Sequence, residues 1–485
     1  MTEQHGLGRL RFWLGAYLFV LFAYFGPGAT WSPVSRFCLT RAIVEKGTFE
    51  ITEFAASTGD RAKVGERYYS DKAPLPSLLA VPAYAAFHAV SRLRGRLPAF
   101  EAEGTPERPA VKVTVSPAFR NGLWVASAST AALSATALGL TLLEVLRRRF
   151  ALRTALAATL GTLLGTPLFP YATSFFGHTI AAALLFGGFA LLDAPEARHA
   201  HRVGAGVLLG AAVGTEYVSA IPALLIFAYS IWRAPREKRV PVAASLAGGA
   251  ALPLAVVGFY QQACFGAPWR TAYSFIARPS FAEGHAKGLL GVTFPSAESL
   301  IGITFGRARG VFYIAPITAL ALFALAFEGW KSKNSERLLA LTCVVVSLWI
   351  NASYYMWSGG WATGPRHAVP GFAFLAFGIA LVFDWKGWPR TFAIGVAGIS
   401  VLVMVLTTAV GLEAPPDRDA IFGYLLPNLS EGRIARLSGA SNLGMALGLP
   451  RRASVIPLLL FCAFGAFFLL ERAAPERAGK SLSNA

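Results

Sequence analysis

The sequence predicts an all-α polytopic membrane protein with about 12 transmembrane helices. Hydrophobic residues make up 55% of the 485-residue chain and charged residues only 14%. Many segments reach the roughly 17 to 25 apolar residues that a helix needs to cross a bilayer. Lys and Arg gather in short loops between these segments, which is typical of cytoplasmic loops.

The composition argues against several other classes of protein. The net charge of +18 does not indicate a nucleic-acid-binding protein, because no basic run is long or interleaved with aromatic residues. The four cysteines are far apart and form no CxxC pair, so neither a zinc site nor a disulfide framework is predicted. Arg9 and Arg11 precede an apolar run without a small-residue cleavage site, which favours a retained first span over a signal peptide.

The first span covers about residues 12–25, and a long polar loop follows it over residues 31–122. Within this loop, residues 34–46 have the pattern of a helix that ends at Gly47. Residues 73–90 are apolar but interrupted by prolines. They are either a second span or a broken helix on the membrane surface.

The basic loops decide between these two interpretations. If residues 73–90 lie on the surface and residues 123–143 form the second span, the loop from Arg147 to Arg153 and all later basic loops lie in the cytoplasm. The surface interpretation is therefore favoured, with both termini in the cytoplasm. The further spans are predicted near residues 155–170, 180–192, 203–214, 217–232, 242–258, 311–327, 338–354, 368–383, 391–410 and 455–470.

The region of residues 203–232 is either a short hairpin that turns at Thr215 and Glu216 or one long tilted span. A single span would bury Glu216 at mid-membrane, which costs several kcal/mol, so the hairpin is preferred.

The predicted outer face collects the long loops rich in aromatic residues, Gly and Pro, at residues 31–122, 175–179, 259–310, 355–367 and 411–452. We therefore expect the function on this face. Residues 1–410 form the predicted transmembrane catalytic region, with residues 31–122 as the catalytic loop. Residues 411–485 comprise an outer loop, the last helix and a short cytoplasmic tail.

Residues 59–84 carry the densest set of chemically useful side chains. Asp60 lies in the polar part of the loop, and Tyr68 and Tyr69 precede the adjacent Asp71 and Lys72. A carboxylate with nearby cations suits a reaction in which a hydroxyl attacks and a phosphate leaves. The carboxylate accepts the proton, while lysine and arginine stabilise the departing charge.

These residues also resemble a known superfamily. YYSDKAPLPSLLAVPAY, from Tyr68, is similar to the first-loop motif of GT-C glycosyltransferases, the polyprenyl-phosphate-sugar-dependent enzymes that include protein O-mannosyltransferases and the lipid A aminoarabinose transferase. Four later segments resemble recurring segments of bacterial members in the same order: FFGHTIAAALLF from Phe175, FYQQACFGAPWRTAY from Phe259, FGRARGVFYIAP from Phe305 and YYMWSGGWATGPRHAVP from Tyr354. The resemblance spans roughly residues 10–385 and implies a GT-C-like fold.

The chain departs from the superfamily at one place. Members commonly carry an acidic pair just after the first span, where residues 31–34 of this chain read WSPV. The base must therefore lie elsewhere. Asp60 is the first candidate, and Asp71 and Glu45 follow.

The resemblance implies that Lys72 and Arg366 hold the donor phosphate, together with Arg307 or Arg309. Ordinary roles compete with these: Lys72 can snorkel to the interface, and Arg366 can anchor a span. The sugar or acceptor contacts are expected among Tyr68, Tyr69, His178, Trp357, Trp361 and His367. Trp357 and Trp361 also suit the aromatic belt of a membrane protein, and His178 suits a hydrogen-bonded interfacial residue.

We therefore expect a hexosyl- or pentosyltransferase of the cytoplasmic membrane that works on the outer face. Its donor is a polyprenyl-phosphate sugar and its acceptor a lipid, glycan or protein. No cofactor is firmly predicted. A divalent metal stays an open alternative, although no spacing of His, Asp or Glu is diagnostic of one. The alternatives are a lipid-linked-sugar flippase or transporter, and a GT-C-like protein without catalysis. An essential Glu216 near the middle of the membrane would favour a transporter. A Glu216 at the outer face would favour a glycosyltransferase.

Overall fold

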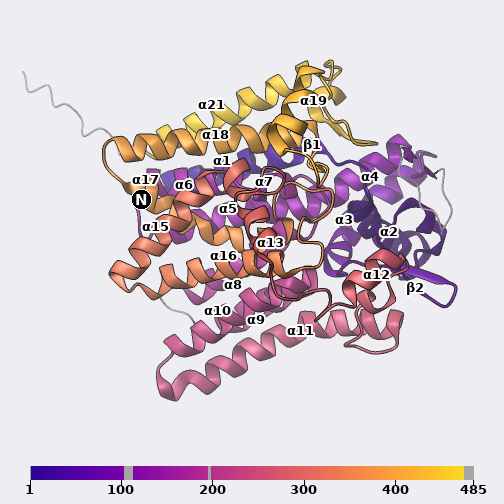
Figure 1. The fold of residues 1–485 in the computed structure, drawn as a ribbon, viewed down its shortest axis with the longest axis horizontal. Coiled ribbons are helices and arrows are strands. Elements are labelled where there is room, and N and C mark those ends of the chain that lie inside the picture. Colours follow the sequence, from indigo (N-terminus) through magenta and orange to yellow (C-terminus); the bar gives the residue numbers. More distant parts are fainter. Residues whose placement is uncertain (1, 103–112, 195–197, 475–485) are drawn as a thin grey trace, which may run out of the picture.

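The computed structural model describes residues 2–102, 113–194 and 198–474. Figure 1 shows a bundle of helices that run roughly along the long axis of the molecule. Smaller elements gather at one end of the bundle, at the right of this view: α2 (Trp31–Arg41), β2 (Arg61–Val64), β3 (Arg67–Ser70), α3 (Leu75–Leu93), α4 (Pro117–Ser127) and α12 (Pro279–His285).

Each predicted span corresponds to a helical segment. In chain order these are α1 (Thr2–Ala23), α4 continued by α5 (Pro117–Leu146), α6 (Leu152–Gly165), α8 (His178–Leu192), α9 (His199–Thr215), η4 with α10 (Tyr217–Arg233), α11 (Arg239–Phe265), α15 (Ile317–Ser332), α16 (Ser335–Ser353), η7 with α17 (Arg366–Asp384), α18 (Trp388–Val410) and α21 (Ile456–Arg472). Within the described residues, seven helices are long and apolar enough to cross a membrane. The protein is thus a multi-pass membrane protein, and the total of about 12 crossings stays a prediction.

The order of α9, α10 and α11 confirms the turn at Glu216. A side chain at Gly206 of α9 would meet the backbone of Leu246 of α11, and one at Gly214 would meet Val257. Position 206 thus lies against 246 and position 214 against 257, so α9 and α11 run parallel. Because α10 connects them, it must return in the opposite direction.

A β-hairpin in the first loop determines the geometry of the site. β2 and β3 pair antiparallel, with Arg61 opposite Ser70, and the chain reverses at Gly65 with a φ of +60°. Asp60 immediately precedes β2, and Asp71 immediately follows β3. The pairing therefore brings the two acids together at the open end of the hairpin.

α3 follows the hairpin and, among the described helices, is not one of those apolar enough to span. It packs against α2 and α4: the Tyr84 ring lies 5.0 Å from that of Phe37 in α2, and a Cβ at Gly122 of α4 would lie 3.0 Å from the Tyr84 ring. Its place at the membrane surface stays a prediction.

The segment after α18 folds back onto the end of α1. β6 (Ser441–Asn442) pairs with β1 (Phe25–Gly26), and the backbone N–H of Ala29 donates to the carbonyl of Ser438 at 2.7 Å. This pairing places residues that follow α18 beside the start of α2.

Candidate active site

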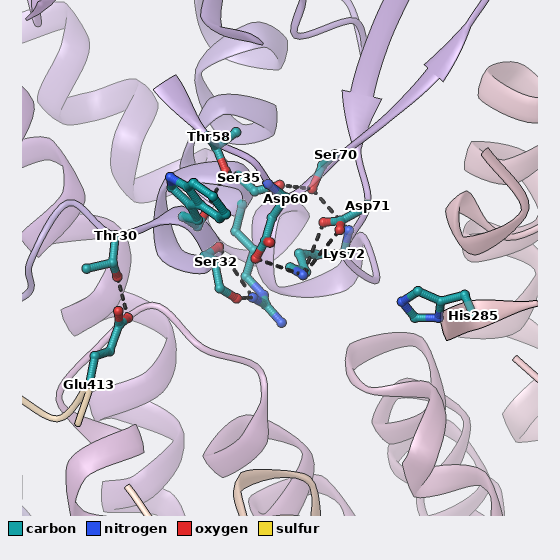
Figure 2. A network of polar contacts seen from close by, with 12 residues as sticks. Thr30, Ser32, Ser35, Thr58, Asp60, Ser70, Asp71, Lys72, His285 and Glu413 are labelled. Atoms are coloured by element: carbon teal, nitrogen blue, oxygen red, sulfur yellow. Dashed lines mark hydrogen bonds and ion pairs between the residues drawn. The ribbon is translucent and has the colours of Figure 1, made fainter. Parts of the chain in front are cut away.

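A lysine held between two acids lies at the open end of the β2–β3 hairpin (Figure 2). Lys72 Nζ is 2.9 Å from Asp60 Oδ2 and 3.2 Å from Asp71 Oδ1. Burial alone would raise the pKa of Asp60, but Lys72, Arg366 and Arg36 outweigh it and lower that pKa, so Asp60 is ionised at neutral pH. Burial, with Asp60 adding to it, raises the pKa of Asp71 to about 6.

α2 supplies a second cation, Arg36. Its Nη2 donates to Glu216 Oε1 at 2.9 Å, and its Nη1 donates to Ser32 Oγ at 2.7 Å. Ser32 lies four residues earlier and therefore on the same helix face. The Ser35 and Ser70 hydroxyls, 2.8 Å apart, fasten α2 to the end of β3. The sequence predicts a helix around Arg36 but assigns this residue no role. The feature that could have identified it is its position as a basic residue in the first turns of the helix after the first span.

Arg366 supplies a third cation at the first residue of η7 (Arg366–Phe374). The loop before it contains Gly359 with a φ of +72° and Gly364 with a φ of +63°, a conformation that other residues rarely adopt. A Cβ at Gly359 would lie 3.1 Å from Cγ of Arg366, so glycine lets the backbone pass close to this arginine. In the described chain, the buried Nε atoms of Arg366 and Arg36 have no hydrogen-bond partner. Such donors are available to an anionic ligand.

Two predicted contact residues, His178 and His367, lie beside these cations. His178 Nδ1 is 3.4 Å from Glu216 Oε1, and the rings of His178 and His367 are 5.7 Å apart. The His367 ring in turn lies 4.9 Å from that of Tyr354. Both histidines thus border the polar network at the ends of spanning helices.

His285 of α12 lies across from Lys72, on the side opposite Thr30 and Glu413 (Figure 2). It stacks on Tyr273 with ring centroids 4.2 Å apart, and its Nε2 lies 3.2 Å from the Tyr354 hydroxyl. Burial lowers the pKa of His285 to about 4, so it is neutral at pH 7. No sequence signal distinguishes this histidine.

The tyrosine pair of the hairpin has a packing role. The Tyr69 ring lies 5.7 Å from Phe265 of α11 in an edge-on contact. The Tyr68 ring lies 4.9 Å from the Arg61 guanidinium. The Tyr69 contact thus fixes the hairpin to the bundle, whereas the Tyr68 contact joins the two strands of the hairpin.

The two other predicted phosphate ligands, Arg309 and Arg307, have partners within the protein. Arg309 is fully buried and donates to the backbone carbonyls of Ser358 at 2.8 Å, Gly360 at 2.6 Å and Ala414 at 2.9 Å, so it holds loops together. Arg307 is 74% exposed and pairs with Asp419 at 3.0 Å.

The two predicted tryptophans lie on the loop that leads to Arg366. Trp357 packs against Gly302 of α13 (Ala297–Thr304), and its carbonyl accepts a hydrogen bond from Asn351 Nδ2 at 2.8 Å. Trp361 is 53% exposed. In the part of the chain that the structure describes, neither tryptophan makes a hydrogen bond or a cation–π contact with Lys72 or Arg36.

Glu413, in the loop after α18, is a further acid at the site that sequence reasoning missed (Figure 2). The Thr30 hydroxyl donates to its Oε1. As for metals, no group of three or more His, Cys, Asp or Glu side chains in the described ranges is arranged to hold an ion.

No protein-family model matches the chain, and no curated relative matches it. Solved structures do match. The apo structure of ArnT from Cupriavidus metallidurans has a TM-score of 0.52 and 16% identity over 98% of this chain and 77% of ArnT. ArnT bound to undecaprenyl phosphate has the same TM-score and identity over 94% and 74%.

The oligosaccharyltransferase AglB from Archaeoglobus fulgidus, in complex with an inhibitory peptide and a dolichol-phosphate, has a TM-score of 0.51 and 12% identity. The match covers 86% of this chain but only 57% of AglB. ArnT and AglB are both GT-C glycosyltransferases. At these identities the likeness is one of fold. The chain is therefore a multi-pass membrane protein with the GT-C glycosyltransferase fold.

Proposed function

We propose that the protein is a membrane glycosyltransferase that moves a sugar from a polyprenyl-phosphate donor to an acceptor hydroxyl on the outer face of the cytoplasmic membrane. The observation that carries this proposal is the gathering of Lys72, Arg36 and Arg366 at one end of the helical bundle. The lipid phosphates bound to two structural neighbours, undecaprenyl phosphate in ArnT and dolichol-phosphate in AglB, agree with such a donor.

In this proposal the three cations hold the phosphate of the donor and stabilise the charge that develops as it leaves. Lysine does so as a point charge, and arginine through paired N–H donors. The unpaired Nε atoms of Arg36 and Arg366 are free for this purpose within the described residues. A phosphate whose charge is held in this way leaves without a general acid.

Asp60 and Asp71 belong to the same catalytic cluster, and we assign them the positioning of Lys72. The sequence makes Asp60 the first candidate for the base. Its carboxylate, however, is paired with Lys72 at 2.9 Å and its pKa is lowered, which makes it a weak proton acceptor. Asp60 is better suited to orient the lysine.

A flippase or transporter is the second candidate, and the place of Glu216 favours transfer over it. Transporters put their essential ionisable groups near the membrane midplane. Glu216 lies at the turn between α9 and α10 and pairs with Arg36 of α2 at 2.9 Å. It therefore lies at the end of the bundle that carries the first loop.

The test is turnover by the purified full-length protein in lipid vesicles. We expect release of free polyprenyl phosphate from at least one member of a panel of polyprenyl-phosphate pentoses and hexoses, with a membrane lipid extract as the source of acceptors. Binding of the carrier without release from any donor would reject the transferase and favour a flippase.

A further inference from the structure

Glu413 is a buried acid at the site that the cluster around Lys72 does not use. Its loop is fixed on both sides of the residue: Arg309 Nη2 donates to the carbonyl of Ala414 at 2.9 Å, and the Tyr424 hydroxyl donates to the carbonyl of Gly411 at 2.6 Å. Since Arg309 is itself anchored to the loop that precedes Arg366, the position of Glu413 is coupled to that of a phosphate-binding residue.

The Glu413 side chain points to the start of α2, where Thr30 donates a hydrogen bond to its Oε1 (Figure 2). Only 8% of the residue is exposed. Among the described residues, no Lys, Arg or His nitrogen lies within 4.0 Å of this carboxylate. Asp60 and Asp71, in contrast, share Lys72. Glu413 is thus held by a neutral hydroxyl.

The surroundings of Glu413 give it a high proton affinity. Burial raises the pKa of Glu413 to about 7, because the Thr30 hydrogen bond and the charge of Arg366 offset burial only in part, and Asp60 adds to the rise. A general base is most effective when its pKa lies near the working pH. Among the acids around the site, this condition fits Glu413 better than the ion-paired Asp60.

We propose that Glu413 is the general base of the reaction, taking the proton from the acceptor hydroxyl. As the O–H bond breaks, the acceptor oxygen forms a bond to the anomeric carbon of the sugar. The bond from that carbon to the phosphate oxygen breaks, and its electron pair leaves with the phosphate. Lys72, Arg36 and Arg366 stabilise this charge. This assignment rests on the proposed glycosyl transfer, and it names the residue that activates the acceptor hydroxyl.

The experiment is the pH dependence of polyprenyl phosphate release by the purified protein in vesicles, with the donor that the wild type accepts. A carboxylate base must be deprotonated, so the wild-type rate falls as the pH drops through about 7. Glu413→Gln lowers the rate on the alkaline side by about 10²- to 10⁴-fold and removes this dependence. Its binding of the donor remains, because the cations are intact.

Thr30→Val provides a second variant that keeps the base. It removes the hydrogen bond that stabilises the ionised carboxylate, so the fall in rate moves to higher pH. Glu431→Gln is the matched control: this glutamate lies in the same segment, is 48% exposed and pairs with Arg433, and its variant keeps the wild-type profile.

The outcomes separate this assignment from the function on which it rests. If the wild type releases polyprenyl phosphate and Glu413→Gln keeps the same rate and pH profile, the base assignment is wrong and the transferase stands. If the pH profile of Thr30→Val is not shifted, the assignment of Glu413 as the base is wrong as well. If the wild type releases nothing from any donor, the proposed function fails, and the assignment fails with it.

Discussion

At the residue scale, the buried pair of Arg36 and Glu216 connects the site to the membrane bundle. Their side chains are 3% and 11% exposed. Arg36→Met leaves Glu216 buried without its cation, and we expect a loss of about 3 to 5 kcal/mol in stability. Thermal unfolding in detergent measures this loss. The double variant Arg36→Met with Glu216→Gln regains most of it, and a single variant as stable as the wild type would contradict the role of the pair.

Sequence reasoning identified Asp60, Asp71, Lys72 and Arg366 as site candidates, and the structure gathers them. The local motif around Lys72 made this possible, because the hairpin ends are close in sequence. Glu413 was missed, since its contact with Thr30 spans 383 residues and no local pattern predicts such a contact.

Other residues were missed, or their roles were left open, for related physical reasons. A histidine such as His285 has the same appearance in a sequence whether it borders a site or a solvated loop. Arg309 was expected to bind phosphate because a loop arginine reads the same whether its donors meet a ligand or, as here, backbone carbonyls.

At the scale of elements, the contact of α9 with α11 depends on glycines. A Cβ at Gly249 would meet the carbonyl oxygen of Val203, whereas one at Gly248 would meet nothing within 4 Å. Small residues of this kind let membrane helices approach closely. Gly249→Ala is therefore expected to lower the unfolding temperature.

Gly248→Ala is the matched control, one position away on the same helix. It keeps or slightly raises the unfolding temperature, because alanine favours a helix by up to about 1 kcal/mol over glycine. If the two variants behave alike, close packing at Gly249 does not stabilise this helix pair.

Hydropathy predicted the helices because a span needs a long apolar run, and the break at Glu216 followed from the cost of burying that charge. The β2–β3 hairpin was read only as a polar loop. Its strands are four residues long, too short for a clear alternation of polar and apolar residues. The hairpin nevertheless sets the geometry of the site.

At the scale of the whole molecule, the distribution of charge predicts which end of the bundle faces the cytoplasm. Lys238 precedes α11 and Lys287 follows α12, and both are exposed. The four native cysteines are all buried, so a single added cysteine gives a clean signal for labelling.

We expect a membrane-impermeant maleimide to label Lys287→Cys on intact cells and Lys238→Cys only after the membrane is opened. This result places the site on the outer face. Labelling of Lys238→Cys alone on intact cells would invert the orientation and contradict the positive-inside assignment.

The overall fold was predictable from the apolar runs and the order of the motifs, and the matched solved structures share this fold. The return of the last segment onto α1 was not, because the β1–β6 pairing depends on two residues at each end of a long chain. That return brings Glu413 to the site, so the base that we propose depends on contacts between distant parts of the chain.

In the proposed transferase, the cations around Lys72 drive the departure of a lipid phosphate. The most direct measurement is the rate of polyprenyl phosphate release by Lys72→Ala beside Lys63→Ala, a lysine of the same hairpin that pairs with Glu66 at 3.4 Å. We predict that Lys72→Ala loses about 10²- to 10³-fold in rate, as removal of a key stabilising group does, while Lys63→Ala stays near the wild type. Equal rates in all three proteins would contradict the account.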